Sequence, residues 1–169
     1  MRGEEIVMQA RSASERFGTC GKFAGAATVE IVKQILAEEG IPTSVRDVFI
    51  QGLPVEIDLV VPRAGAEPLL NGLLYEPTQV ACALEIKLSG LHSKKDVPSI
   101  IRNFDRAKAL GVPCGYVTLG ERKSYRDKAT EENLGFPCFT LTWHTAKTLS
   151  DTGDWPRLLT FLHQQLSAV

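Results

Sequence analysis

Three segments of the chain carry apolar residues three and four positions apart, which is the spacing of an amphipathic helix. These segments are 21–40, 97–110 and 154–166. Gly40, followed by Pro42, marks the end of the first segment, and Asp96 with Pro98 marks the start of the second. Pro156 lies in the first turn of the third segment, where proline is tolerated. The pattern therefore predicts three helices.

Shorter apolar runs, bounded by glycine and proline, predict strands. The runs are "SVRDVFIQ" from Ser44, "VEIDLVVP" from Val55, "VACALEIKL" from Val80, "PCGYVTLG" from Pro113 and "FPCFTLTW" from Phe136. The first three are expected to form a short antiparallel meander. The order of elements predicts an α/β fold with a single mixed β-sheet flanked by helices. Its core is αβββαβ, followed by a C-terminal strand and helix.

Residues 63–79 form a long, irregular connection between the second and third predicted strands. Four leucines in this connection, at positions 69, 70, 73 and 74, are expected to pack onto the core. No repeat, low-complexity tract or linker interrupts the sequence. With 169 residues the chain has the length of one domain with a sizeable core, so we expect 1–169 to form a single domain.

The composition excludes several classes of protein. The chain is 44% apolar and 23% charged, as in ordinary globular proteins. No stretch approaches the roughly 20 apolar residues of a membrane helix, and the N-terminal residues lack the apolar core of a signal peptide. We therefore expect a cytoplasmic protein with no membrane partner. The four cysteines contain no CxxC pair, which argues against a zinc knuckle or a disulfide framework and favours reduced, buried thiols.

The formal net charge is −1, but the charges are unevenly distributed. Residues 85–128 hold ten Lys or Arg and five Asp or Glu, which gives this segment a net charge of +5. Such a segment can present one basic face to nucleic-acid phosphates. The alternative is an excess of positive charge on solvated loops.

Charged residues interrupt two of the predicted strands. Side chains alternate along a strand, so Glu56 and Asp58 share one face of the second strand. Glu85 and Lys87 likewise share one face of the third. If the two strands are neighbours, Asp58, Glu85 and Lys87 converge on one polar face.

Two carboxylates brought together repel each other, and one of them tends to take up a proton. A divalent cation removes this conflict. Mg²⁺ accepts one or two protein carboxylates, keeps its other positions for water and phosphate, and lowers the pKa of a bound water. A neighbouring ammonium can position that water or neutralise charge on the phosphate. Asp58, Glu85 and Lys87 therefore suit metal-assisted phosphodiester hydrolysis. The alternative is a solvated ion pair between Glu85 and Lys87 on an edge strand.

The arrangement resembles the PD-(D/E)XK nuclease superfamily, which has the restriction-endonuclease-like fold. That pattern is an Asp on one strand and Glu-x-Lys on the next, and the chain offers Asp58 and Glu85-Ile86-Lys87. The family's order of helix, three-strand meander, helix and strand matches residues 21–119, although its Pro-Asp dipeptide is absent here. The resemblance implies that Asp58, Glu85 and the carbonyl of Ile86 bind Mg²⁺, for which Mn²⁺ may substitute. Lys87 would assist the attacking water.

Two further acids are possible metal ligands. Some members of the family place an acid on the first helix, and Glu30 is the candidate by position. The helical wheel turns Glu30 nearly opposite the apolar face, so a solvated role is the alternative. Glu56 lies on the same strand face as Asp58 and is either an additional ligand or a solvated neighbour.

Basic residues that follow the Glu-x-Lys motif are candidates for contacts with phosphates, which position a nucleic acid without reading its sequence. They are Lys94, Lys95, Arg102, Arg106, Arg122 and Lys123. The expected partner is nucleic acid, with DNA favoured over RNA. A homodimer is a further possibility, because many proteins of this fold pair to cut two strands.

The sequence thus predicts a metal-dependent nuclease that hydrolyses phosphodiester bonds of DNA. The alternative is a catalytically inactive protein of the nuclease fold that acts as a nucleic-acid-binding or assembly subunit. The intact set of Asp58, Glu85 and Lys87 favours the enzyme, since an inactive descendant has no need of all three.

Overall fold

The structure, a computed structural model, describes most of the chain. The described residues are 4–6, 8, 9, 12, 21–88, 97–122, 124, 131–145 and 148–168. Three of the predicted phosphate contacts, Lys94, Lys95 and Lys123, lie outside these ranges, and only the backbone of Arg122 is described.

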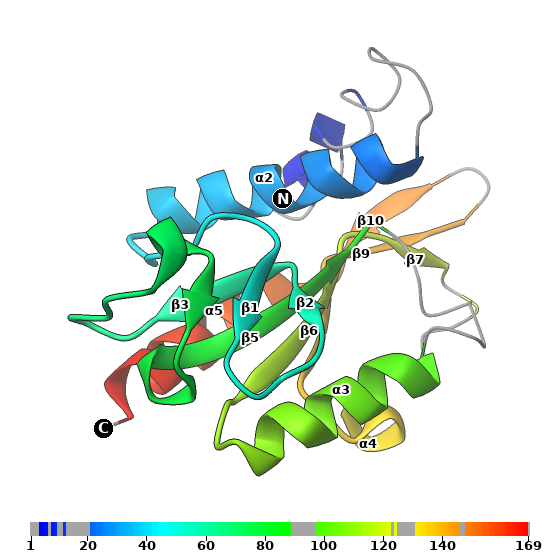
Figure 1. The fold of residues 1–169 in the computed structure, drawn as a ribbon. Coiled ribbons are helices and arrows are strands. Elements are labelled where there is room, and N and C mark those ends of the chain that lie inside the picture. Colours follow the sequence, from blue (N-terminus) through cyan, green and yellow to red (C-terminus); the bar gives the residue numbers. More distant parts are fainter. Residues whose placement is uncertain are drawn as a thin grey trace.

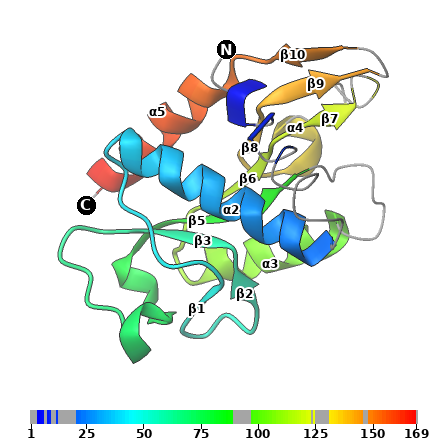
Figure 2. The ribbon, with the colours of Figure 1, turned by 90° about the horizontal axis from the view of Figure 1, so that it is seen from above.

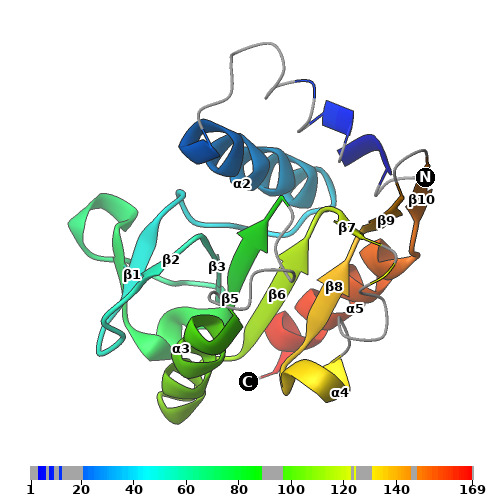
Figure 3. The ribbon, with the colours of Figure 1, turned by 90° about the vertical axis from the view of Figure 1, so that its right-hand side faces the viewer.

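A four-stranded mixed sheet lies at the centre of the fold, with strand order β3-β5-β6-β8 (Figure 3). Its strands are β3 (Leu59–Pro62), β5 (Val80–Lys87), β6 (Cys114–Thr118) and β8 (Cys138–Thr140). β3 runs antiparallel to β5, whereas β5, β6 and β8 are parallel. A parallel pair needs a crossover connection, and the helix α3 (Val97–Ala109) provides it between β5 and β6.

Helices cover both faces of this sheet. On one face lie α2 (Gly21–Glu38) and α5 (Asp154–Ser167), which share an apolar cluster with β5. In Figure 2 α2 crosses in front of the central strands. On the other face lie α3 and the short α4 (Glu131–Leu134), below the strands in Figure 1. This layering confirms the predicted α/β class. No helix among the described residues is long and apolar enough to cross a membrane.

Two small sheets flank the central one, where the sequence predicted a single sheet. One has the order β2-β1-β4 and the other β10-β9-β7. Their strands are β1 (Val48–Ile50), β2 (Glu56–Ile57), β4 (Leu74–Tyr75), β7 (Glu121–Arg122), β9 (Thr142–His144) and β10 (Leu149–Asp151). Two 3₁₀ turns, η1 (Leu70–Gly72) and η2 (Pro77–Gln79), lie on either side of β4.

The predicted strand over residues 55–62 is interrupted at Asp58. The residues before it form β2, which pairs with β1, and the residues after it form β3, which pairs with β5. Asp58 itself lies in a bend, where its carbonyl accepts the N–H of Asp47 at 3.2 Å. This bend carries the chain from the outer sheet into the central one.

The expectation that four leucines of the long connection pack onto the core is wrong for three of them. Leu69, Leu70 and Leu73 are 53%, 70% and 40% exposed, and Leu74 alone is half-buried. The cause is the tight turn η1, in which Leu70 and Asn71 have φ values of 52° and 57°. A branched residue at positive φ is uncommon, so its presence was not foreseeable from the apolar pattern.

Three cysteines lie among the described residues, and all are free thiols: Cys82, Cys114 and Cys138. Burial raises the pKa of Cys82 well above its ordinary value. Burial, assisted by nearby carboxylates, raises the pKa of Cys114 and that of Cys138 to about 12. These thiols therefore behave as small apolar side chains.

At pH 8, iodoacetamide should leave these three cysteines almost unmodified in the folded protein. The thiolate is the nucleophile, and a pKa of about 12 leaves on the order of one thiol in ten thousand ionised. Mass spectrometry of tryptic peptides, with a urea-unfolded sample as control, measures the difference. Equal alkylation of folded and unfolded protein would contradict the burial described above.

Candidate active site

The structure brings Asp58, Glu85 and Lys87 together on one face of the central sheet. The pairing of Leu59 with Leu84 places Asp58 beside Glu85 at the end of the β3–β5 ladder. The Nζ atom of Lys87 lies 3.2 Å from Oδ2 of Asp58 and 2.6 Å from Oε1 of Glu85. The side chains of Asp58 and Glu85 are only 22% and 20% exposed, and that of Lys87 is 37% exposed. The ammonium therefore bridges two half-buried carboxylates, one from the bend before β3 and one from β5.

The backbone of β5 also orients Asp58. The N–H of Ile86 donates to Oδ2 of Asp58 at 2.7 Å, so the carboxylate occupies the position that a further residue of β3 would take. In an extended strand the N–H and C=O of one residue point to the same edge. The carbonyl of Ile86 therefore faces the edge on which Asp58 lies.

The charges of the three side chains depend on one another. Burial raises the pKa of Glu85, and the nearby charge of Asp58 raises it further, whereas Lys87 opposes both effects. Burial alone would lower the pKa of Lys87, but the attraction of the two carboxylates outweighs burial and raises that pKa. Lys87 is therefore a permanent cation at neutral pH.

Carboxylate and carbonyl oxygens, the donor types of this cluster, are those that hard divalent cations prefer. Each carboxylate has a second oxygen besides the one that contacts Lys87, and the Ile86 carbonyl adds a third donor. Within the part of the chain that the structure describes, no group of three or more His, Cys, Asp or Glu is placed to hold a metal. A site with two carboxylates still suits Mg²⁺, which keeps several of its waters.

The two additional acids lie on the surface. Glu30 of α2 is 53% exposed, and its oxygens lie 3.7 Å from Nζ of Lys33 and 3.8 Å from Nε of Arg46. The structure thus places Glu30 in a surface ion cluster rather than beside Lys87. Glu56 is exposed in β2, opposite Phe49 of β1.

Two of the predicted phosphate contacts are described with their side chains. Arg102 and Arg106 lie one turn apart on α3, and both are exposed. The buried side of α3 packs through Phe104 on Tyr116, which is the β6 partner of Glu85 in the sheet. Both arginines therefore stand on the helix that covers the sheet face of the candidate site.

Residues 44–47, which were predicted as part of a strand, contact the backbone of residues 58–60. The strand β1 begins only at Val48. Ser44 forms hydrogen bonds with Val60, and Asp47 forms one with Asp58. A serine and an aspartate in an otherwise apolar run were the only sequence signal, and they did not indicate which strand they would meet.

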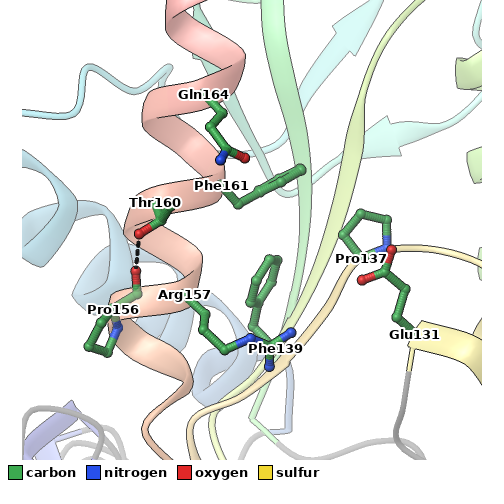
Figure 4. Close-up of a pocket in the computed structure, with 8 residues that line it drawn as sticks. All are labelled: Glu131, Pro137, Phe139, Pro156, Arg157, Thr160, Phe161 and Gln164. Atoms are coloured by element: carbon green, nitrogen blue, oxygen red, sulfur yellow. Dashed lines mark hydrogen bonds between the residues drawn. The ribbon is translucent and has the colours of Figure 1, made fainter.

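One cleft of the described surface lies elsewhere, between α5 and the segment around Pro137, and has a volume of about 490 Å³. The rings of Phe139 and Phe161 project into it (Figure 4). Arg157 stands at its rim, 5.7 Å from the Phe139 ring centre and paired with Asp154. None of the three clustered residues lines this cleft.

Comparisons with known proteins show the fold. No family model matches the sequence, and no curated protein matches it. The cAAA-bound form of NucC from P. aeruginosa ATCC27853 gives a TM-score of 0.64 at 15% identity, covering 96% of this chain and 87% of that chain. The cAAA-bound form of NucC from E. coli MS115-1 gives 0.65, with the same identity and coverage. Its apo form gives 0.52 at 13% identity, covering 96% and 88%.

The chain shares the fold of NucC. This is the restriction-endonuclease-like fold that the Asp and Glu-x-Lys pattern implied. At 15% identity the likeness concerns the fold, so the chemistry must be argued from the side chains.

Replacing Lys87 with methionine should destabilise the metal-free protein at pH 7 by about 1–2 kcal/mol. Without the ammonium, burial and the charge of Asp58 raise the pKa of Glu85 without opposition. A carboxyl whose pKa is raised on folding favours the folded state at low pH, and this contribution is lost as the pH rises through the folded pKa.

The difference in urea unfolding between the variant and the parent should therefore be small near pH 4 and large at pH 7. Lys33→Met is the matched control, because Lys33 is similarly half-buried but its partner Glu30 is an exposed carboxylate. A pH-independent difference for Lys87→Met would contradict the electrostatic account.

Proposed function

We propose that this protein is a metal-dependent nuclease that hydrolyses phosphodiester bonds of DNA through Asp58, Glu85 and Lys87. One observation carries the proposal: a single ammonium contacts, at 3.2 Å and 2.6 Å, two half-buried carboxylates, one from the bend before β3 and one from β5. A merely structural ion pair needs one acid, and the second acid adds repulsion unless it serves another purpose. The shared fold with NucC supports the same reading.

In this proposal Asp58, Glu85 and the carbonyl of Ile86 hold Mg²⁺, and Mn²⁺ can replace it. When bound, the ion polarises the phosphoryl oxygen and lowers the pKa of a water. The N–H of Ile86 keeps the Asp58 carboxylate at the edge of β5. In the metal-free protein both carboxylates raise the pKa of Lys87, so the residue is an ammonium that can donate a hydrogen bond to water or phosphate.

Basic side chains near the sheet face would hold the DNA backbone. Arg102 and Arg106 stand on the exposed side of α3 and can reach phosphates without reading bases. The same role is proposed for Lys94, Lys95, Arg122 and Lys123. DNA is favoured over RNA, and a homodimer would allow both strands of a duplex to be cut.

Asp58→Ala and Lys87→Ala should each reduce cleavage of plasmid DNA in Mg²⁺ at least about 100-fold, because each removes a group that stabilises charge in the transition state. Cleavage of the parent should also stop in EDTA. Lys33→Ala is the control, since it removes a half-buried lysine whose partner is the exposed Glu30. The assay uses plasmid, single-stranded DNA and RNA, each with and without cAAA, which two of the structural neighbours contain.

Two outcomes would contradict this proposal. Variants that cleave as fast as the parent would place the activity elsewhere or in a contaminant. Tight DNA binding without cleavage under all these conditions would instead favour the inactive nucleic-acid-binding or assembly subunit.

The double variant Arg102→Gln, Arg106→Gln should weaken DNA binding and flatten its salt dependence. Each lost phosphate contact lowers the slope of log K against log salt by about 0.9 on duplex DNA. Fluorescence anisotropy in EDTA measures binding without cleavage. Arg157→Gln, which removes an exposed arginine from α5 on the other face of the sheet, should leave the slope unchanged.

A further inference from the structure

The backbone around Asp58 is held on the side away from β5 by residues 44–47. The N–H of Asp47 donates to the carbonyl of Asp58 at 3.2 Å. Two residues further along, Ser44 and Val60 exchange two hydrogen bonds. The N–H of Ser44 donates to the Val60 carbonyl at 2.8 Å, and the N–H of Val60 donates to Oγ of Ser44 at 2.9 Å. β3 is the terminal strand of the central sheet, so these bonds take the place of a further strand.

The hydrogen bonds between Ser44 and Val60 should contribute more to stability than the bond between Asp47 and Asp58, because Ser44 is buried. Its residue is 3% exposed, and Val60 is fully buried. A buried N–H that loses its acceptor cannot turn to water, so its loss costs more than the loss of a surface hydrogen bond. The hydroxyl of Ser44 therefore fixes where β3 lies along its outer edge.

Asp47 contributes through its backbone conformation. Its φ is 59°, in the left-handed region that Asp, Asn and Gly adopt at least cost. Its carboxylate faces Arg46 at 3.2 Å, and Arg46 reaches Glu30 of α2 at 3.8 Å. Exposed ion pairs of this kind contribute little. The φ of Asp47, rather than its charge, sets the direction of the N–H toward Asp58.

We propose that Ser44 and Asp47 are positioning residues of the candidate site, which hold the Asp58 backbone so that its carboxylate stays on Ile86 and Lys87. The proposal deepens the proposed function, because Asp58 is a ligand there. Two hydrogen bonds hold Asp58 from opposite sides: the N–H of Asp47 donates to its carbonyl, and the N–H of Ile86 donates to its Oδ2. If the hydrogen bonds from residues 44–47 are lost, the Asp58 carboxylate is expected to move away from Ile86 and Lys87, although every proposed ligand is still present in the chain.

The first test compares Ser44→Ala with Thr152→Val. Thr152 is the matched control, because its hydroxyl also ties backbone segments together, at Thr140 and Asp154, but on the α5 side of the molecule. Hydrogen exchange of the Ile86 amide, followed by NMR in metal-free protein, reports directly on its bond to Asp58. Calorimetric titration with Mn²⁺ reports on the ligands.

Ser44→Ala should speed exchange of the Ile86 amide by at least about tenfold and weaken Mn²⁺ binding about tenfold, the size of effect seen when supports of metal ligands are removed. Thr152→Val should lower the melting temperature with neither change. If Ser44→Ala lowers the melting temperature but leaves both the Ile86 amide and the Mn²⁺ affinity as in the parent, the positioning role is overturned.

The second test separates the backbone of Asp47 from its carboxylate. Asp47→Asn and Asp47→Gly retain the N–H and tolerate positive φ, so both should keep the Ile86 amide and Mn²⁺ affinity of the parent. Asp47→Val disfavours that φ and should behave like Ser44→Ala. Loss of Mn²⁺ affinity in Asp47→Asn would overturn the proposal, because the carboxylate itself would then be the working group.

These readouts do not require cleavage. A parent protein that cleaves no nucleic acid, together with a faster-exchanging Ile86 amide in Ser44→Ala, would remove the proposed function and leave the positioning role standing. If the parent does cleave DNA and the Ile86 amide of Ser44→Ala exchanges as slowly as in the parent, the positioning role is overturned and the proposed function stands.

Discussion

The contact of one ammonium with two carboxylates is the interaction on which this site depends. Asp58, in the bend before β3, and Glu85, in the neighbouring strand β5, are mostly buried, so their charges would repel at short range without a cation between them. Lys87 supplies that cation from the strand of Glu85, and the same strand donates the Ile86 N–H to Asp58. One strand therefore provides a carboxylate, a backbone N–H and an ammonium at three successive positions, 85, 86 and 87. The segment that leads into the antiparallel neighbour β3 contributes one residue, Asp58, which lies opposite Glu85.

The spacing of apolar and charged residues predicted the features that depend on neighbouring positions in the chain. The alternation of side chains along β5 placed Glu85 and Lys87 on one face, and helical spacing located the three long helices. The break at Asp58 was not predictable in this way. It arises because residues on its two sides pair with different strands, and the choice of partner depends on distant residues. The exposed leucines escaped prediction for a similar reason: a tight turn with positive φ directs them outward regardless of their hydrophobicity.

The fold and the side chains of the site support different conclusions about this protein. The fold is shared with NucC over 96% of this chain although only 15% of residues are identical, which means that the layer architecture tolerates extensive substitution. A scaffold of this kind can hold many chemistries, so the claim for hydrolysis rests on three side chains. Glu30 shows the difference: its position on the first helix fits a pattern, but its exposed ion pairs with Lys33 and Arg46 belong to the protein surface.

The exposed leucines around η1 have a consequence for how the protein behaves in solution. Leu69, Leu70 and Leu73 are exposed, as is Phe49, whose backbone N–H donates to the Leu73 carbonyl. Exposed apolar side chains associate more strongly in sulfate or phosphate, which are excluded from protein surfaces and strengthen apolar burial. Self-association of the protein through this segment should therefore depend on the buffer anion.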